Sequence, residues 1–191
     1  PFDNDEEYIF LRAFSLNGQN KSAFEKNQTG SWRYDIVDQG LKVNMPDIGA
    51  AIGLAQMRKY PTELLPERMR IFERYQAAFA QNDWALLPNF ADAEHESSCH
   101  LYMLRIAGAD EARRDAIIDL ISARGIGVNV HFIPMAMLTL FKSRGYQMAD
   151  YPKTYELYAN EITLPLYNGL TDAQVDEVIQ AVRDAVEATA A

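Results

Sequence analysis

The sequence predicts an α/β protein, because segments of strand periodicity alternate with segments of helical periodicity through its second half. Residues 99–106 are almost all apolar or aromatic, which is typical of a strand buried on both faces. Residues 126–133 alternate, with an aliphatic row on one side and mostly small or polar residues on the other. Helical patterns fill 110–125 and 171–186, so we expect helices packed on a sheet.

The composition excludes several classes of function. The 191 residues are 48% apolar and carry a formal net charge of −9, which argues against nucleic acid or an anionic membrane as the main partner. No apolar run approaches the ~20 residues that cross a bilayer. Cys99 is the one cysteine, so we expect neither a disulfide nor a metal site, and the cytoplasm is the expected compartment.

The first half of the chain predicts three helices. Asn4 is a suitable N-cap for the first, since three acidic residues follow it. Pro46 opens the second helix, whose apolar residues repeat at steps of three and four and predict a core-facing stripe: Ile48, Ala51, Ile52 and Ala55. Pro61 or Pro66 marks a kink or a fresh start, after which an amphipathic helix runs to Phe79.

Local signals also punctuate the second half. Residues 84–87 predict a short strand, and Asp110 and Gly125 are the expected start and stop of a helix. Thr171 and Gln174 have the spacing of a capping box at the start of the last helix.

Lys42 and Asn44 form a candidate anion site just before the second helix. They alternate with Leu41 and Val43, so in an extended segment both polar side chains leave the same side of the chain. A cation and an amide beside a helix N-terminus suit a phosphate. A solvated loop leading into a core helix explains the same spacing.

His131 is the second candidate. In the alternating segment it lies on the side opposite the aliphatic row, next to Asn129 and the small Gly127. A lone histidine is often only a hydrogen-bonded polar residue, so the pattern by itself leaves a binding role and a structural role open. For His100, at the entry of the predicted strand 99–106, a structural role is expected.

Several motifs follow one another in a fixed order. They are Trp32-x-Tyr34, Gly40-x-Lys42-x-Asn44-Met45-x-Asp47-Ile48, His100-Leu101-Tyr102, Gly125-Ile126-Gly127-x-x-x-His131-Phe132-x-Pro134 and Ile162-Thr163-Leu164-Pro165-Leu166-Tyr167. Together they resemble the DegT/DnrJ/EryC1/StrS sugar aminotransferases, which are fold-type I enzymes that use pyridoxal 5'-phosphate. The last motif is interpreted as a packing element without chemistry.

The resemblance implies the C-terminal part of such an enzyme. Residues 1–45 would end the large cofactor-binding domain, 46–81 would form connecting helices, and 82–191 would form a small α/β domain. The family's cofactor lysine precedes the segment that this chain resembles, so no catalytic residue is assigned here and the chain alone is expected to be inactive. The complete protein would transfer an amino group, usually from glutamate, to a keto sugar linked to a nucleotide.

The resemblance also implies roles for the two candidate sites. Lys42 and Asn44 would reach the cofactor phosphate of the other subunit in a homodimer with shared active sites. His131 and Phe132 would border the nucleotide-sugar substrate. One departure is Ala136, where many family members have a second histidine.

Two other interpretations stay open at the level of sequence. The chain could be a non-catalytic domain that binds a partner or a nucleotide sugar, or one chain of a split aminotransferase whose lysine comes from another polypeptide. An upstream segment with the lysine in the intact gene would favour an ordinary enzyme.

Overall fold

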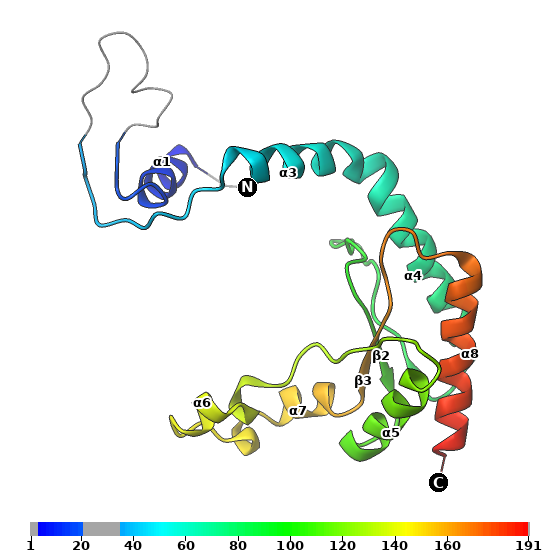
Figure 1. Ribbon diagram of the computed structural model, residues 1–191. Helices are drawn as coiled ribbons and strands as arrows, with labels where there is room; N and C mark the ends of the chain where they lie inside the picture. Colours follow the sequence, from blue (N-terminus) through cyan, green and yellow to red (C-terminus); the bar gives the residue numbers. More distant parts are fainter. Residues whose placement is uncertain (1–3, 21–34, 191) are drawn as a thin grey trace. The chain divides into compact units, whose positions relative to one another are not determined.

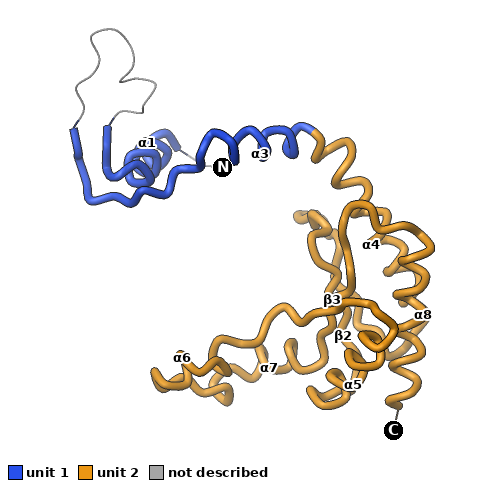
Figure 2. Tube along the Cα trace, viewed as in Figure 1, with its two compact units in different colours: residues 1–58 blue, residues 59–191 orange. Residues whose placement is uncertain are grey.

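The computed structural model describes residues 4–20 and 35–190, which form two compact units, 1–58 and 59–191. Figure 2 shows the two units in different colours, and each is described here by itself. The sequence motif Trp32-x-Tyr34 lies outside the described residues. The division into 1–45, 46–81 and 82–191 stays a prediction.

The first unit contains helices α1 (Asp5–Phe14) and α3 (Asp47–Lys59), of which α3 ends one residue beyond the unit. The predicted N-cap is confirmed, because the Asn4 side chain accepts a hydrogen bond from the Glu7 backbone N–H at 2.8 Å. Gly18, with a φ of 71°, lets the chain turn back after α1.

The predicted core-facing stripe of the second helix is wrong for the described residues. No residue of α1 or α3 is buried, and Ile48 and Ile52 are 79% and 62% exposed. The helical period makes a stripe, but only a second packed element buries it, and the described part of the chain does not supply one. The described residues of the first unit therefore expose many large apolar side chains.

The second unit begins with a π-helical turn, η1 (Tyr60–Leu64), that leads into α4 (Leu65–Phe79). Pro61 lies in this turn, so the irregularity predicted at a proline takes the form of a π-helical turn between two consecutive helices.

A three-stranded antiparallel sheet forms the centre of the second unit, with strands β1 (Ala85–Leu86), β2 (Tyr102–Ile106) and β3 (Glu161–Leu164) in that order. Helix α4 packs with α5 (Glu111–Ser122) and α8 (Asp172–Ala188) over one face of the sheet (Figure 1). The buried core between them includes Phe72, Tyr75, Tyr102, Leu104, Ile106, Ile117, Ile162, Leu164, Val178 and Val182.

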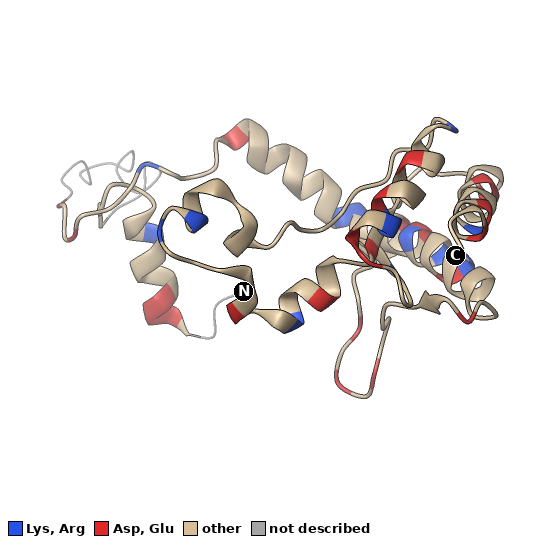
Figure 3. Ribbon diagram, turned by 90° about the horizontal axis from the view of Figure 1, so that it is seen from below, with Lys and Arg blue, Asp and Glu red and all other residues tan. Residues whose placement is uncertain are grey.

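Local capping signals fix where the helices of this unit begin. The Asp110 carboxylate accepts a hydrogen bond from the Arg113 backbone at the start of α5, and Thr171 with Gln174 forms the predicted capping box of α8. Basic and acidic residues are interspersed along the helices (Figure 3). One ion pair links two of these helices, since Arg74 Nη2 of α4 donates to Asp176 Oδ1 of α8 at 2.5 Å.

Two strand predictions need correction. Residues 126–133 form only one isolated bridge, between Asn129 and Thr163. The next bonded pair of this ladder would join His131 to Glu161, but the His131 N–H donates to the Glu161 side chain at 3.0 Å and the Glu161 carbonyl oxygen accepts from Arg114. On the other side of the bridge the partner of Gly127 would be Pro165, which has no N–H. The segment 99–106 contains β2, but β2 is buried on one face only, since Met103 is 39% exposed.

Short helices fill the stretch before β3. They are η2 (Met135–Met137), α6 (Thr139–Lys142), η3 (Met148–Asp150) and α7 (Pro152–Tyr158). Within 4–20 and 35–190, no helix combines the length and the apolar character needed to cross a membrane. In the same residues, no group of three or more His, Cys, Asp or Glu side chains could hold a metal ion.

Candidate functional site

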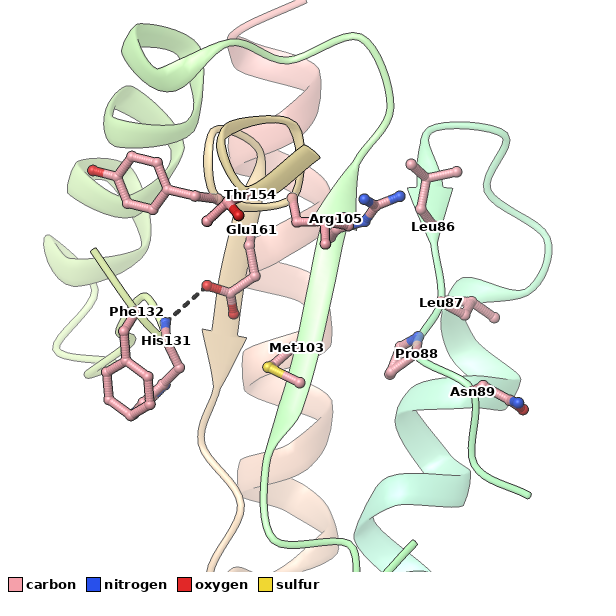
Figure 4. A pocket seen from close by; sticks show the side chains of 12 residues that line it. Leu86, Leu87, Pro88, Asn89, Met103, Arg105, His131, Phe132, Thr154 and Glu161 are labelled. Atoms are coloured by element: carbon pink, nitrogen blue, oxygen red, sulfur yellow. Dashed lines mark hydrogen bonds between the residues drawn. The ribbon is translucent and has the colours of Figure 1, made fainter. Parts of the chain in front are cut away.

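A pocket of about 530 Å³ lies against the face of the sheet opposite α4, α5 and α8, and residues of α7 form part of its lining. The strand register explains this position. Arg105 of β2 is paired with Glu161 of β3, and side chains directly opposite each other leave the same face of an antiparallel sheet. Figure 4 shows the lining residues, which are Leu86, Leu87, Pro88, Asn89, Met103, Arg105, His131, Phe132, Thr154, Leu157, Tyr158 and Glu161.

His131 and Phe132 both line this pocket, so the structure brings the predicted substrate-binding pair to a cavity. The His131 backbone N–H donates to Glu161 Oε2 at 3.0 Å, and the ring atom Nδ1 lies 2.9 Å from Thr163 Oγ1. The Phe132 ring packs edge-on against the His131 ring, with 4.6 Å between the ring centroids. Phe132 is 73% exposed, which leaves most of its ring available to a ligand.

Glu161 is a buried carboxyl group at the base of the pocket, only 4% exposed. Burial raises the pKa of Glu161, although the hydrogen bonds from Thr163 and from the His131 backbone favour the ionised form. The Thr163 hydroxyl donates to Glu161 Oε1, so one carboxyl group contacts both the backbone of His131 and the side chain that touches its ring.

Arg114 of α5 donates hydrogen bonds to backbone carbonyl groups before and at the start of β3. Its side chain is 2% exposed, and Nη1 donates to the carbonyl oxygen of Tyr158 at 2.8 Å and to that of Glu161 at 3.4 Å. Its guanidinium group also lies 4.7 Å from the centroid of the Tyr158 ring. Because Tyr158 and Glu161 both line the pocket, this buried arginine stabilises two of its walls.

Glu161, Thr163 and Arg105 are site residues that the sequence analysis missed. Residues Ile162 to Tyr167 were interpreted as a packing motif, yet the polar Glu161 and Thr163 alternate with the apolar Ile162 and Leu164. That alternation was the available signal, because it predicts a strand whose second face meets something polar.

Lys42 and Asn44, the predicted phosphate-binding pair, belong to the first unit and both are exposed. The segment forms an antiparallel bridge between Lys42 and Leu16, as an extended chain does, and α3 follows at Asp47. A lysine side chain, an amide donor and the N-terminus of a helix are each groups that suit a phosphate, and the assignment of Lys42 and Asn44 to one stays a prediction.

His100 does not line the pocket. Its side chain is exposed, and its backbone oxygen accepts a hydrogen bond from Arg68 Nη1 at 3.4 Å.

The fold of this chain is found in sugar aminotransferases of solved structure, over about half of their length. The structure matches Spr1654 of Streptococcus pneumoniae, assigned as a sugar aminotransferase, in its PMP form with a TM-score of 0.88 and 40% identity. The match covers 99% of this chain and 47% of Spr1654. The PLP form of Spr1654 gives a TM-score of 0.87 at 39% identity, covering 100% of this chain and 46% of that protein.

The chain belongs to the DegT/DnrJ/EryC1/StrS aminotransferase family, whose family model matches residues 2–183. It is 35% identical over 189 residues to the spore coat polysaccharide biosynthesis protein SpsC of Bacillus subtilis strain 168, covering 97% of this chain and 48% of SpsC. The chain thus spans about half the length of the relatives it matches, and the resemblance and the fold class predicted from the sequence are confirmed.

Proposed function

We propose that the complete protein is a pyridoxal-phosphate-dependent aminotransferase that transfers an amino group, from glutamate, to a keto sugar linked to a nucleotide. The observation that carries the proposal is the match to the aminotransferase family across residues 2–183. The PLP and PMP forms of Spr1654 support the choice of cofactor, and that cofactor supplies the electron sink when it is bound. The lone Cys99 agrees with the cytoplasm as the compartment.

The pocket that contains His131, Phe132 and Arg105 is the site we assign to the sugar substrate. His131 offers a ring nitrogen, Arg105 offers a guanidinium group that suits an anionic part of the substrate, and Phe132 offers an exposed aromatic ring. These three groups together fit a ligand with hydroxyl groups, a flat ring and a negative charge.

Lys42 and Asn44 are the residues we assign to the cofactor phosphate. Their donor set fits a dianion, and we propose that they act in the active site of a second subunit. The exposed apolar side chains of the first unit need a covering surface, which we assign to the second subunit together with the rest of the complete protein. The catalytic lysine would come from a part of the protein outside these 191 residues.

The reaction is tested with the complete protein, a nucleotide-linked keto sugar and glutamate, by measuring the 2-oxoglutarate formed. His131→Ala should raise the KM for the sugar while retention of the cofactor stays unchanged. A lost hydrogen bond of about 0.5–1.5 kcal/mol corresponds to a change of about twofold to tenfold. His95→Ala is the matched control, because His95 is 79% exposed on a loop outside the pocket.

If the His131→Ala variant is folded and its KM for the sugar is unchanged, then His131 does not bind the substrate. If the complete protein forms no 2-oxoglutarate with any of a range of keto sugars, the proposed reaction is wrong.

The phosphate site is tested by mixing two inactive subunits. One lacks the cofactor lysine, and the other carries Lys42→Ala and Asn44→Ala. If the pair acts across the interface, both lesions fall in the same pocket of the mixed dimer and one intact site regains activity. Verified mixed dimers without activity would contradict the assignment of Lys42 and Asn44.

A further inference from the structure

Glu161, Thr163 and His131 form a polar cluster whose purpose the proposed substrate contacts do not explain. Glu161 and Thr163 are 4% and 5% exposed, so the carboxyl and hydroxyl groups are removed from water. A buried carboxyl group is costly unless its oxygens accept hydrogen bonds. Here both oxygens do, one from the His131 backbone and one from Thr163.

The hydrogen atoms in this cluster can be assigned from what each group is able to donate. An ionised carboxylate only accepts, and the hydroxyl of Thr163 has one hydrogen, which it gives to Glu161 Oε1. The Thr163 oxygen can then only accept from His131 Nδ1, which lies 2.9 Å away. A neutral imidazole that donates from Nδ1 carries no hydrogen on Nε2, so Nε2 has a free lone pair.

We propose that Glu161 and Thr163 are positioning residues that hold His131 in the form protonated at Nδ1, so that Nε2 accepts a hydrogen bond from a hydroxyl group of the sugar substrate. This inference deepens the proposed function and rests on it for the identity of the ligand. Neither residue needs to touch the substrate. They act through the tautomer of His131, as the groups behind a metal-bound histidine do.

The His131 backbone N–H fixes how a glutamine side chain would be oriented at position 161. That N–H needs an acceptor where Glu161 Oε2 lies. In Glu161→Gln the amide oxygen must therefore take this position, and the amide NH₂ then faces Thr163 and donates to its oxygen. The buried Thr163 hydrogen then finds its acceptor within the cluster at His131 Nδ1, which favours the ring form with its hydrogen on Nε2. The substitution keeps the shape and inverts the tautomer.

The test is nitrogen NMR of the chain labelled with ¹⁵N-histidine, at about pH 8.5, well above the usual histidine pKa of about 6.5. The sequence has three histidines, and the signals of His131 are those lost in His131→Ala. We expect Nδ1–H in the wild type, Nε2–H in Glu161→Gln, and an unrestrained mixture in Thr163→Val. Thr163→Ser keeps the hydroxyl group and should keep the wild-type spectrum.

An Nε2–H tautomer in the wild type, or an unchanged tautomer in Thr163→Val and Glu161→Gln, overturns the proposal. Circular dichroism checks that each variant is folded, and an Nε2–H signal in the wild type contradicts the proposal even if a variant does not fold. In the complete enzyme, Glu161→Gln should raise the KM for the sugar about threefold to tenfold, whereas Thr163→Ser alone should leave this KM unchanged.

The two proposals fail in different ways. If the tautomer follows the prediction but His131→Ala leaves sugar kinetics unchanged, the assignment of the pocket to the sugar fails and the positioning cluster stands. If His131→Ala impairs sugar use but the tautomer does not respond to Glu161 or Thr163, the positioning roles fail and the pocket assignment stands.

Discussion

Replacing Arg114 by methionine tests how the wall of the pocket is held. The side chain is 2% exposed and lies between α5 and the start of β3, where it donates to the carbonyl oxygen of Tyr158 at 2.8 Å. Methionine keeps an apolar stem of similar length against Tyr158 but has no donor. The two buried carbonyl oxygens, of Tyr158 and Glu161, would lose this partner.

The expected loss follows from the groups left behind. A buried acceptor without a partner costs about 1–3 kcal/mol. Loss of the guanidinium group from the Tyr158 ring adds about 0.5–2 kcal/mol. The carboxylate of Asp115, bonded to Arg114 Nε at 2.6 Å, is 60% exposed, so water replaces that contact at little cost. Removal of the arginine itself relieves its desolvation. We expect the free energy of unfolding to fall by about 3 kcal/mol.

The assay is urea unfolding of the chain, followed by circular dichroism, together with a thermal scan. A loss of about 3 kcal/mol lowers the Tm by about 6–12 °C for a chain of this size. Arg124→Met is the matched control, because Arg124 is 47% exposed and pairs with Asp184 at the surface. The reasoning is refuted if Arg114→Met loses less than about 1 kcal/mol, or no more than Arg124→Met does.

Three further predictions follow from single residues. Asp110→Ala should lower the free energy of unfolding by about 1 kcal/mol through loss of the α5 cap, whereas Asp110→Asn should retain it in the same urea assay. Leu104→Ala should cost about 2–5 kcal/mol and Met103→Ala much less, since only Leu104 faces the core; similar losses would mean that β2 is packed on both faces. Burial raises the pKa of Glu161 above the ordinary value of 4.5, so the wild type should lose stability relative to Glu161→Gln as the pH rises from 4.5 through the folded-state pKa. Parallel curves of unfolding free energy against pH for these two proteins would contradict that sign.

Features that depend on a few neighbouring residues could be predicted from the sequence. Asn4, Asp110 and Thr171 were expected as N-caps, and each accepts a hydrogen bond from a backbone N–H three residues later. A cap needs only a short polar side chain at the right distance from the helix, so the surrounding fold does not change the outcome.

Features that depend on distant partners could not be predicted in the same way. The periodicity of residues 126–133 was that of a strand, but a strand also needs a continuous ladder of backbone partners, and the His131 N–H donates to the Glu161 side chain instead of its backbone. The stripe of α3 was correctly placed on a helix, yet its burial depends on a surface that the described residues do not provide.

In the candidate site, too, some residues could be named from the sequence and others depended on distant partners. His131 and Phe132 were named from the sequence, and both line the pocket. Glu161 could not be connected with His131, because thirty residues separate them and only the pairing of β3 with the Asn129 bridge brings them together.

The two faces of β3 separate stability from recognition within four residues. Ile162 and Leu164 point into the core, whereas Glu161 and Thr163 lie on the pocket side and contact His131. All four are buried, because the segment carrying His131 covers the pocket-side pair. Burial alone would therefore assign the four residues to the core, and their polarity and hydrogen-bond partners distinguish them. A substitution that keeps the shape of a pocket-side residue should consequently change how His131 binds while the core, formed by the alternate residues, stays packed.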